Sequence, residues 1–374
     1  MSILQRHSKK LACLTLAALL ALGFGERGWA SWQQEWEEVV KAAKKEGKVV
    51  VSIPASAKLR KQMEEAFEKR FPGIDLEPIP GRGSKSVRRI TDEFKAGVRY
   101  FDIHVGGTSS MLTGLVRPGL VSPIEPSMLL PGVKDAKNWW GGHIYFDKAK
   151  RFAYTFTAYL SKNFWYNTNL VNPKGLSSFD DLLNPKWNGK IGFYDPRRPG
   201  AGGSTWAYMW EIKGEKFLKK LVQQDLQVTR NRRVLAESLA KGKLSLTIGL
   251  TYYSFRQFVD AGLPIKPLPT FREGTYVSGG SGNLAILKDP PHPNATKVFV
   301  NWLLSKEGQE IFTHAMGQPT RRLDVDTTWI HKFGYVPAKE ALTVEDYYKY
   351  ENQSEEKILK IRLPGRKLAK KLLK

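Results

Sequence analysis

The sequence has few of the residues and motifs that several protein classes require. One cysteine among 374 residues excludes a disulfide framework and any cysteine-rich zinc or iron–sulfur site. Beyond the N-terminus, no uninterrupted apolar run approaches the roughly 20 residues of a membrane-spanning helix, which excludes a protein with several spans. The six histidines lack the spacing of a metal-binding motif, and the sequence has neither a Walker phosphate-binding loop nor a G-x-S-x-G nucleophile elbow. The composition is otherwise that of a soluble globular protein, and the length favours two lobes.

Acidic residues are also scarce: the sequence has 36 Asp and Glu against 59 Lys and Arg, which gives a formal charge of +23. At the N-terminus, a basic start precedes the uncharged apolar run Leu11–Phe24 and the small-residue site Gly28–Ala30. This pattern predicts a secretory signal peptide, residues 1–30, that is cleaved near Ala30; a retained membrane anchor is the alternative. In an exported protein, the excess of positive charge indicates an anionic ligand or membrane surface rather than nucleic acid.

Apolar patterning predicts alternating strands and helices. In residues 31–153 we expect buried strands at Lys48–Ile53, Ile74–Ile79 and Phe101–Val105, each followed by a helix with one apolar face. The middle of the chain repeats the pattern, with strands at Phe164–Thr168, Lys190–Asp195 and Leu244–Leu250. Such alternation is typical of parallel sheets with right-handed crossovers.

These elements divide the chain into lobes. Lobe 1 is predicted to contain residues 31–153 and 270–325, lobe 2 residues 154–269, and residues 326–374 a C-terminal helical extension with a basic tail. We expect a hinge near residues 153–157 and 270–278. The last stretch, Lys357–Lys374, has eight basic residues and no acid, so we expect a mobile tail in preference to a membrane-binding helix.

Small polar residues follow the predicted strands, at the sheet edge where open α/β folds bind ligands. In the first lobe these are Ser56, the segment Gly81–Lys85, and the pair Thr108 and Ser109. Each leads into a helix N-terminus, where free backbone N–H groups attract anions. The alternative is that the serines and threonines only cap their helices.

The second lobe has a similar set. Tyr166 ends one strand, the glycine-rich segment Pro199–Thr205 follows the next, and Tyr252 and Tyr253 follow the third. Both phenols can meet one ligand, or iron(III) as phenolates, only if the strand has ended by Tyr252. The alternative is one buried and one exposed tyrosine.

Several segments resemble the periplasmic solute-binding proteins of ABC importers. They are EWEEVVKAAKKEGKVVVS, EEAFEKRFPGI, WYNTNLV, DLLNPKWNGKIGFYDP and PHPNATKVFVNWLLSKEGQ. The stretch NPKWNGKIG and the tyrosine pair are similar to the branch that contains iron(III)-binding proteins. The resemblance covers nearly all of the mature chain. It implies a two-lobed α/β periplasmic-binding-protein fold, in which each lobe is a mainly parallel sheet flanked by helices and the ligand cleft lies between the lobes.

Iron binders of this branch hold the metal with a histidine, a glutamate and a tyrosine pair, completed by an anion. The pair matches Tyr252 and Tyr253, and the anion loop matches Pro199–Ser204. The histidine and glutamate positions fall near Ser56 and Gly107, neither of which is a metal ligand. This departure favours an anionic organic solute, such as a phosphonate or phosphate ester. Ferric iron held by the two tyrosines and an anion is the alternative.

The resemblance thus implies an exported, non-enzymatic protein that captures a small solute and presents it to an ABC importer permease in the membrane. Its expected ligand contacts are Ser56, Thr108, Ser109, Tyr166, Gly203, Ser204, Tyr252 and Tyr253. We expect a periplasmic monomer that binds no nucleic acid and has no cofactor, with iron(III) only as the alternative transported ligand. A secreted enzyme using the same cleft is the second alternative, for which the sequence offers only His104 and Asp195.

Overall fold

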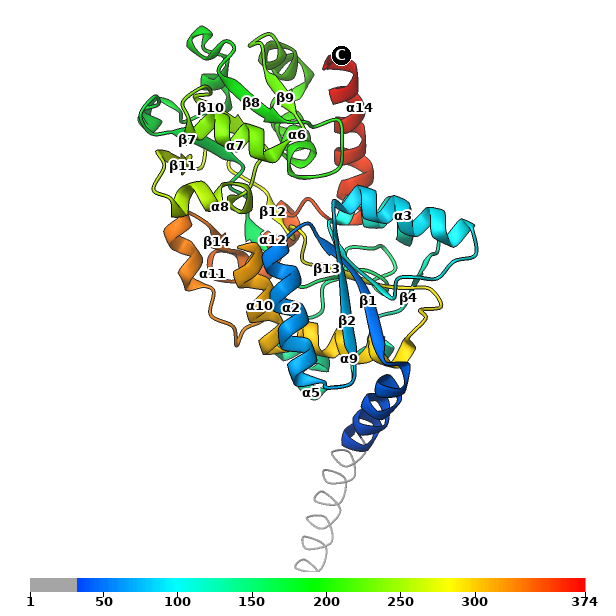
Figure 1. The fold of residues 1–374 in the computed structure, drawn as a ribbon. Helices are drawn as coiled ribbons and strands as arrows, with labels where there is room; N and C mark the ends of the chain where they lie inside the picture. The colour runs from blue at the N-terminus through cyan, green and yellow to red at the C-terminus, as the bar shows by residue number, and fades with distance from the viewer. Residues whose placement is uncertain (1–31, 374) are drawn as a thin grey trace, which may run out of the picture.

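The structure, a computed structural model, describes residues 32–373, so the expected signal peptide lies outside the described residues. The strands gather in two larger sheets, one in each lobe, and a small sheet joins them (Figure 1). Within residues 32–373, no helix combines the length and the apolar character needed to cross a membrane.

The sheet of lobe 1 has the order β2-β1-β3-β13-β4, with β5 beside β13. Its strands are β1 (Lys48–Pro54), β2 (Asp75–Gly81), β3 (Ile103–Gly106), β4 (Val121–Ser122), β5 (Tyr154–Thr155) and β13 (Asn283–Leu287). The first three are parallel, as the alternation predicts. β13 is antiparallel to β3, β4 and β5, because the chain re-enters this lobe from lobe 2 in the opposite direction. The sheet is therefore mixed, and β5 belongs to lobe 1.

Helices cover both faces of this sheet. They are residues 32–46, α2 (Ala57–Arg70), α3 (Gly83–Lys95), α4 (Thr108–Met111), the π-helix η1 (Leu112–Val116), α5 (Pro131–Lys134), α9 (Pro293–Leu304) and α10 (Lys306–Met316). Val49 and Val51 of β1 pack in one core with Phe67 of α2, whereas Val50 packs in another with Leu112. Both faces of β1 are therefore covered, which explains why its sequence is a continuous apolar run and does not alternate with polar residues.

The sheet of lobe 2 has the order β11-β7-β10-β8-β9. Its strands are β7 (Phe164–Asn167), β8 (Ile191–Tyr194), β9 (Gln227–Thr229), β10 (Leu246–Ile248) and β11 (Ile265–Pro267), and its helices are α6 (Ala201–Val222), α7 (Arg232–Ala240) and α8 (Tyr252–Asp260). The three strands predicted for this lobe are confirmed as β7, β8 and β10. β8 is parallel to β9 and β10 as predicted, but β7 is antiparallel to β10 and β11, so this sheet is mixed as well. Short 3-10 helices complete the two lobes: η2 (Glu125–Ser127), η3 (Ala136–Asn138), η4 (Pro173–Gly175), η5 (Phe179–Leu183), η6 (Pro185–Trp187) and η7 (Thr328–Phe333).

A three-stranded sheet, β12-β6-β14, joins the lobes. Its strands are β6 (Tyr159–Leu160), β12 (Val277–Ser278) and β14 (Val336–Pro337). β6 and β12 lie on the two segments by which the chain passes between the lobes, close to the expected hinge. The helices α11 (Ala338–Ala341) and α12 (Val344–Tyr350) follow β14, and their residues Ala338 and Tyr347 share a core with Val277.

The C-terminal segment is not a mobile tail, contrary to the prediction. It is helical through α13 (Glu355–Lys357), the π-helix η8 (Ile358–Arg362) and α14 (Leu363–Leu372). Ile358 and Ala369 are fully buried, and α14, red in Figure 1, packs beside α6 of lobe 2. The prediction failed because the count of basic residues hid an apolar face of the helix that the rest of the fold covers.

Candidate ligand site between the lobes

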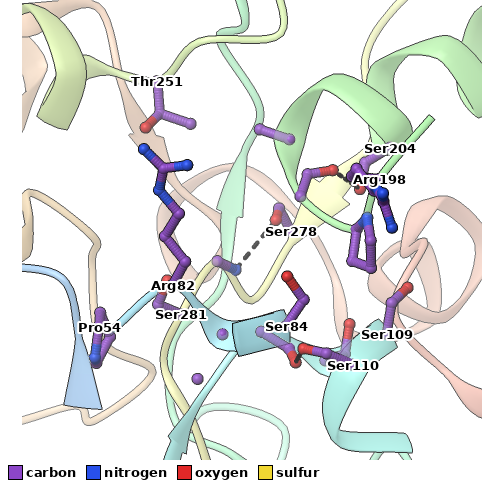
Figure 2. Close-up of a pocket in the computed structure, with 18 of the residues that line it drawn as sticks. Pro54, Arg82, Ser84, Ser109, Ser110, Arg198, Ser204, Thr251, Ser278 and Ser281 are labelled. Atoms are coloured by element: carbon purple, nitrogen blue, oxygen red, sulfur yellow. Dashed lines mark hydrogen bonds between the residues drawn. The ribbon is translucent and has the colours of Figure 1, made fainter. Parts of the chain in front are cut away.

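A cavity of about 490 Å³ lies between the two lobes, at the carboxyl ends of parallel strands. The strands β1, β2, β3 and β8 contribute Pro54, Gly81, Gly106 and Tyr194 to its lining. Figure 2 shows Arg82, Ser109 and Ser110 from lobe 1, and Arg198, Ser204 and Thr251 from lobe 2, around the same space. Open α/β sheets bind ligands at this edge, and the volume suits a small organic molecule.

Two longer helices, α3 and α6, begin at this cavity without a capping side chain, and their N-cap residues are Arg82 and Gly200. A third, α8, also begins there, and its first N–H group, that of Tyr252, donates to the Tyr335 hydroxyl. By contrast, the side chains of Ser56, Asn231 and Ser305 accept hydrogen bonds from first-turn N–H groups of α2, α7 and α10. An uncapped helix start leaves N–H groups for another acceptor and carries the positive end of the helix dipole. The cavity therefore offers backbone donors to an anion.

The lining of the cavity is strongly cationic. It includes the side chains of Arg82, Lys85, Arg88, Arg198, Arg230, Arg232 and Arg362. Among the described lining residues, Asp195 is the one carboxylate, and it already forms ion pairs with Arg197 at 2.9 Å and Arg230 at 3.0 Å. Burial raises the pKa of Asp195, but the hydrogen bonds from these two arginines outweigh it and hold the pKa below its ordinary value. The field in the cavity therefore attracts anions.

Four buried polar atoms of lining residues have no hydrogen-bond partner within the described part of the chain. They are Ser109 Oγ, Asn163 Oδ1, Asn352 Nδ2 and Gln353 Oε1. Leaving such an atom without a partner costs about 1–3 kcal/mol. A solute that carries both oxyanion and hydroxyl groups would supply acceptors for the serine and the Asn352 amide nitrogen, and donors for the two amide oxygens.

Four of the eight residues expected to contact the ligand line the cavity: Thr108, Ser109, Ser204 and Tyr253. Thr108 Oγ1 accepts a hydrogen bond from the Arg362 guanidinium at 2.9 Å. The Tyr253 hydroxyl donates to the carbonyl oxygen of Ala55, and so joins α8 of lobe 2 to lobe 1 at the edge of the cavity.

Three other expected contacts are placed elsewhere, each for a local reason. Ser56 caps α2 by accepting a hydrogen bond from the Leu59 N–H at 3.1 Å. Tyr166 lies in β7 between two neighbouring strands, and its side chain packs into the core of lobe 2. Gly203 lies in the first turn of α6, where a Cβ would come 2.8 Å from the carbonyl oxygen of Arg198, so it shapes the segment without lining the cavity.

The tyrosine pair is divided between the core and the cavity. α8 begins at Tyr252, and consecutive helical residues point about 100° apart. Tyr252 is 2% exposed and packs against Phe255 and Tyr335 in a core cluster, where burial raises its pKa to about 12. Tyr253 lines the cavity. The alternative of one buried tyrosine is therefore the correct one, and the two phenols do not face one ligand.

Among the described residues, the two candidates for a cleft enzyme, His104 and Asp195, do not lie together. Residues 32–373 contain no group of three or more His, Cys, Asp or Glu that could hold a metal. His104 is buried in β3, with Nδ1 3.0 Å from Ser52 Oγ, and burial lowers its pKa to about 4. It is not among the residues that line the cavity with Asp195.

The sequence predictions missed most of the cationic lining. Arg82 and Lys85 lie in the predicted polar segment after β2, and Arg198 directly precedes the glycine-rich segment of lobe 2. A search for basic residues beside those segments would have found all three. Arg362 gave no such signal, because it is 254 residues away in sequence from its partner Thr108.

The fold and the cavity together define a two-lobed periplasmic binding protein. A family model described as "Bacterial extracellular solute-binding protein" matches residues 31–310. The chain therefore belongs to this family, whose members are the solute-binding components of ABC import systems.

Individual relatives are distant but match along most of their length. An uncharacterized protein from Haemophilus influenzae is 25% identical over 362 residues, covering 94% of this chain and 95% of its own. Among solved structures, the periplasmic binding protein AfuA from Actinobacillus pleuropneumoniae, with fructose-6-phosphate bound, has a TM-score of 0.62 and 20% identity, covering 87% of this chain and 98% of its own. Iron-bound HitA from Pseudomonas aeruginosa has a TM-score of 0.65 and 19% identity, covering 87% and 99%. At these identities, the structures show the fold alone.

Proposed function

We propose that this protein binds an anionic organic solute, such as a phosphate ester or phosphonate, between its lobes and delivers it to an ABC importer permease. The observation that carries the proposal is the cationic lining, whose one described carboxylate is already engaged by two arginines. The uncapped starts of α3 and α6 add backbone donors. Together these features favour an oxyanion over a cationic or neutral solute.

The solute is larger than an inorganic anion and carries hydroxyl groups. A cavity of about 490 Å³ leaves room for an organic part beside a phosphate or phosphonate group. The amide oxygens of Asn163 and Gln353 need donors, which hydroxyl groups provide. Fructose-6-phosphate, the ligand of AfuA, combines both kinds of group.

Ferric iron is a weaker candidate, although HitA was solved with iron bound. A phenolate pair requires both tyrosines at one site, and Tyr252 lies in the core of lobe 2. The positive field of the lining also opposes a trivalent cation.

We further propose that the protein acts outside the cytoplasm as a monomer, after cleavage before Ser31. N-terminal sequencing of the protein recovered from its native compartment tests the cleavage. A mature chain that begins at Ser31 is expected, and a retained Met1 would contradict the proposal.

A thermal-shift screen of the mature protein tests the ligand class. The panel contains fructose 6-phosphate, glycerol 3-phosphate, 2-aminoethylphosphonate, fructose, spermidine and ferric citrate. A ligand at about 100 times its Kd stabilises the protein by about 2.7 kcal/mol, which raises the melting temperature by several degrees. We expect such a rise with a phosphate ester or phosphonate, and a smaller rise at higher ionic strength. Stabilisation by ferric iron or spermidine with none by any anionic solute would overturn the proposal.

A further inference from the structure

The C-terminal helix forms a connection between the lobes in addition to the two chain crossings. At its start, Ile358 packs in the lobe 1 core that contains Val50 and Leu112. Near its end, Leu368 and Leu373 pack in the lobe 2 core that contains Trp206. The segment from α13 to α14 therefore passes from one lobe to the other beside the cavity, which Arg362 lines at the last residue of the π-helix η8. π-Helical turns are rare and are often found at functional sites.

Arg362 is a buried cation whose hydrogen bonds go to neutral groups, with the Glu351 carboxylate within electrostatic reach but not in an ion pair with it. The residue is 8% exposed, and its guanidinium donates to Thr108 Oγ1 at 2.9 Å and to the Asn352 carbonyl oxygen at 3.2 Å. Both partners are neutral, and Arg362 forms no ion pair within residues 32–373. Burial lowers its pKa to about 10, which still leaves the side chain charged at neutral pH. A buried charge with incomplete compensation is costly, so this arrangement favours the arrival of an anion.

Two further arginines strengthen the positive field around it. Arg366, one turn further along the helix, has a buried Nε with no partner among the described residues. Burial lowers the pKa of Arg362 most, Tyr276 and Glu351 raise it, and the positive charge of Arg366 lowers it. The pKa of Arg366 is lowered by burial first and then by the positive charge of Arg198. Arg198 and Arg362 thus line the cavity together with Ser109, whose hydroxyl has no partner among the described residues, and Arg366 adds positive charge from outside the lining. A role only in holding the helix in place would not require a charge at this point, because the apolar contacts at both ends already do so.

We propose that Arg362 is the residue that anchors the anionic group of the solute, and that the C-terminal helix carries it so that the bound anion contacts both lobes and their connection. This inference rests on the proposed function, because it requires the solute to be an anion. The anionic group lies between the Arg362 guanidinium and the polar start of α4, where Thr108 and Ser109 line the cavity.

The test compares three variants by isothermal titration calorimetry with fructose 6-phosphate, or with whichever anion of the screen the wild type binds. Arg362→Gln removes the charge, and Arg362→Lys keeps the charge without the planar fork of donors. Lys367→Gln is the matched control, because it removes one positive charge from an exposed position of α14. We expect affinity to fall about tenfold to a hundredfold in Arg362→Gln, in line with a hydrogen bond to a charged group. The loss is expected to be smaller in Arg362→Lys and absent in Lys367→Gln.

A melting curve of each ligand-free variant separates anchoring from a structural role. Arg362→Gln is expected to melt at or above the wild-type temperature, because it removes a buried charge. Wild-type affinity in Arg362→Gln would overturn this inference and leave the proposed function intact. Weaker binding together with a lower melting temperature would identify a structural residue and also overturn the inference. A wild type that binds none of the anions would overturn the proposed function, and this inference with it.

Discussion

Two serines that the sequence marks as equivalent are expected to respond differently to mutation. Both follow a strand of lobe 1, and both are buried, Ser56 at 5% and Ser109 at 2% exposed. The Ser56 hydroxyl accepts the first-turn hydrogen bond of α2, whereas Ser109 Oγ has no partner among the described residues and faces the cavity. Ser56→Ala should therefore lower stability without affecting binding, and Ser109→Ala should weaken binding without lowering stability.

The magnitudes follow from what each hydroxyl does. Loss of an N-cap serine costs about 1 kcal/mol, or about 2 °C in melting temperature for a chain of this size. Removal of an unsatisfied buried hydroxyl is neutral or slightly stabilising for the ligand-free protein. A hydrogen bond from Ser109 to a charged phosphate oxygen is worth about 1.5–3 kcal/mol, so Kd should rise about tenfold to a hundredfold in Ser109→Ala.

Differential scanning calorimetry of the ligand-free variants and titration calorimetry with the solute measure the two effects separately. Each variant serves as the control of the other, since both remove one hydroxyl from a buried serine of the same lobe. Unchanged affinity in Ser109→Ala, or loss of affinity in Ser56→Ala, would refute this assignment of the site.

Three further outcomes are expected. Gly202→Ala should lower the free energy of unfolding by about 3 kcal/mol in calorimetry, because its Cβ would lie 1.9 Å from the Tyr194 carbonyl oxygen; Gly175→Ala, with nothing within 4 Å, should have little effect. The pKa of Asp195 is lowered in the folded protein, so its ionised carboxylate stabilises the fold. This stabilisation is fully present at pH values above the ordinary pKa, near 4, and is lost as the pH falls below it. In Asp195→Asn, the free energy of unfolding, measured by denaturant titration at a series of pH values, should therefore fall less steeply below about pH 4 than in the wild type. An unchanged slope would contradict the stabilising role of the ion pairs. Small-angle scattering should show a smaller radius of gyration on saturation with a proven ligand, and an unchanged radius would count against lobe closure.

The fold could be predicted because its signals are local. Three successive valines in β1 require cover on both faces, and helices alternate with such strands along the chain. What escaped prediction is the antiparallel direction of β13 in lobe 1 and of β7 in lobe 2, since the direction of a strand depends on where the chain enters the sheet and not on the pattern of the strand itself.

The site was harder to predict because side chains that are neighbours in the sequence lie in different surroundings. Tyr252 and Tyr253 are adjacent, yet the start of α8 directs one into the core and the other into the cavity. Ser56 and Ser109 each precede or begin a helix, yet only one is used as a cap. These differences depend on the residue at which a helix begins, which is the feature of a helix that sequence patterns locate least well. Arg362 lay beyond any local pattern, because a helix from the end of the chain brings it to the cavity.

Cationic side chains and uncapped helix starts from both lobes meet at the cavity. Elsewhere, helices such as α2, α7 and α10 satisfy their first turns with their own side chains. At the cavity, the starts of α3 and α6 lack such caps, and four buried polar atoms of the lining have no described partner. Cationic side chains from both lobes and from the C-terminal helix line the same space. In the ligand-free protein, repulsion among these cations opposes close approach of the lobes. With the anionic solute that we propose, the attraction of the cations to the anion would replace this repulsion, and the same groups would both recognise the solute and stabilise the closed lobes.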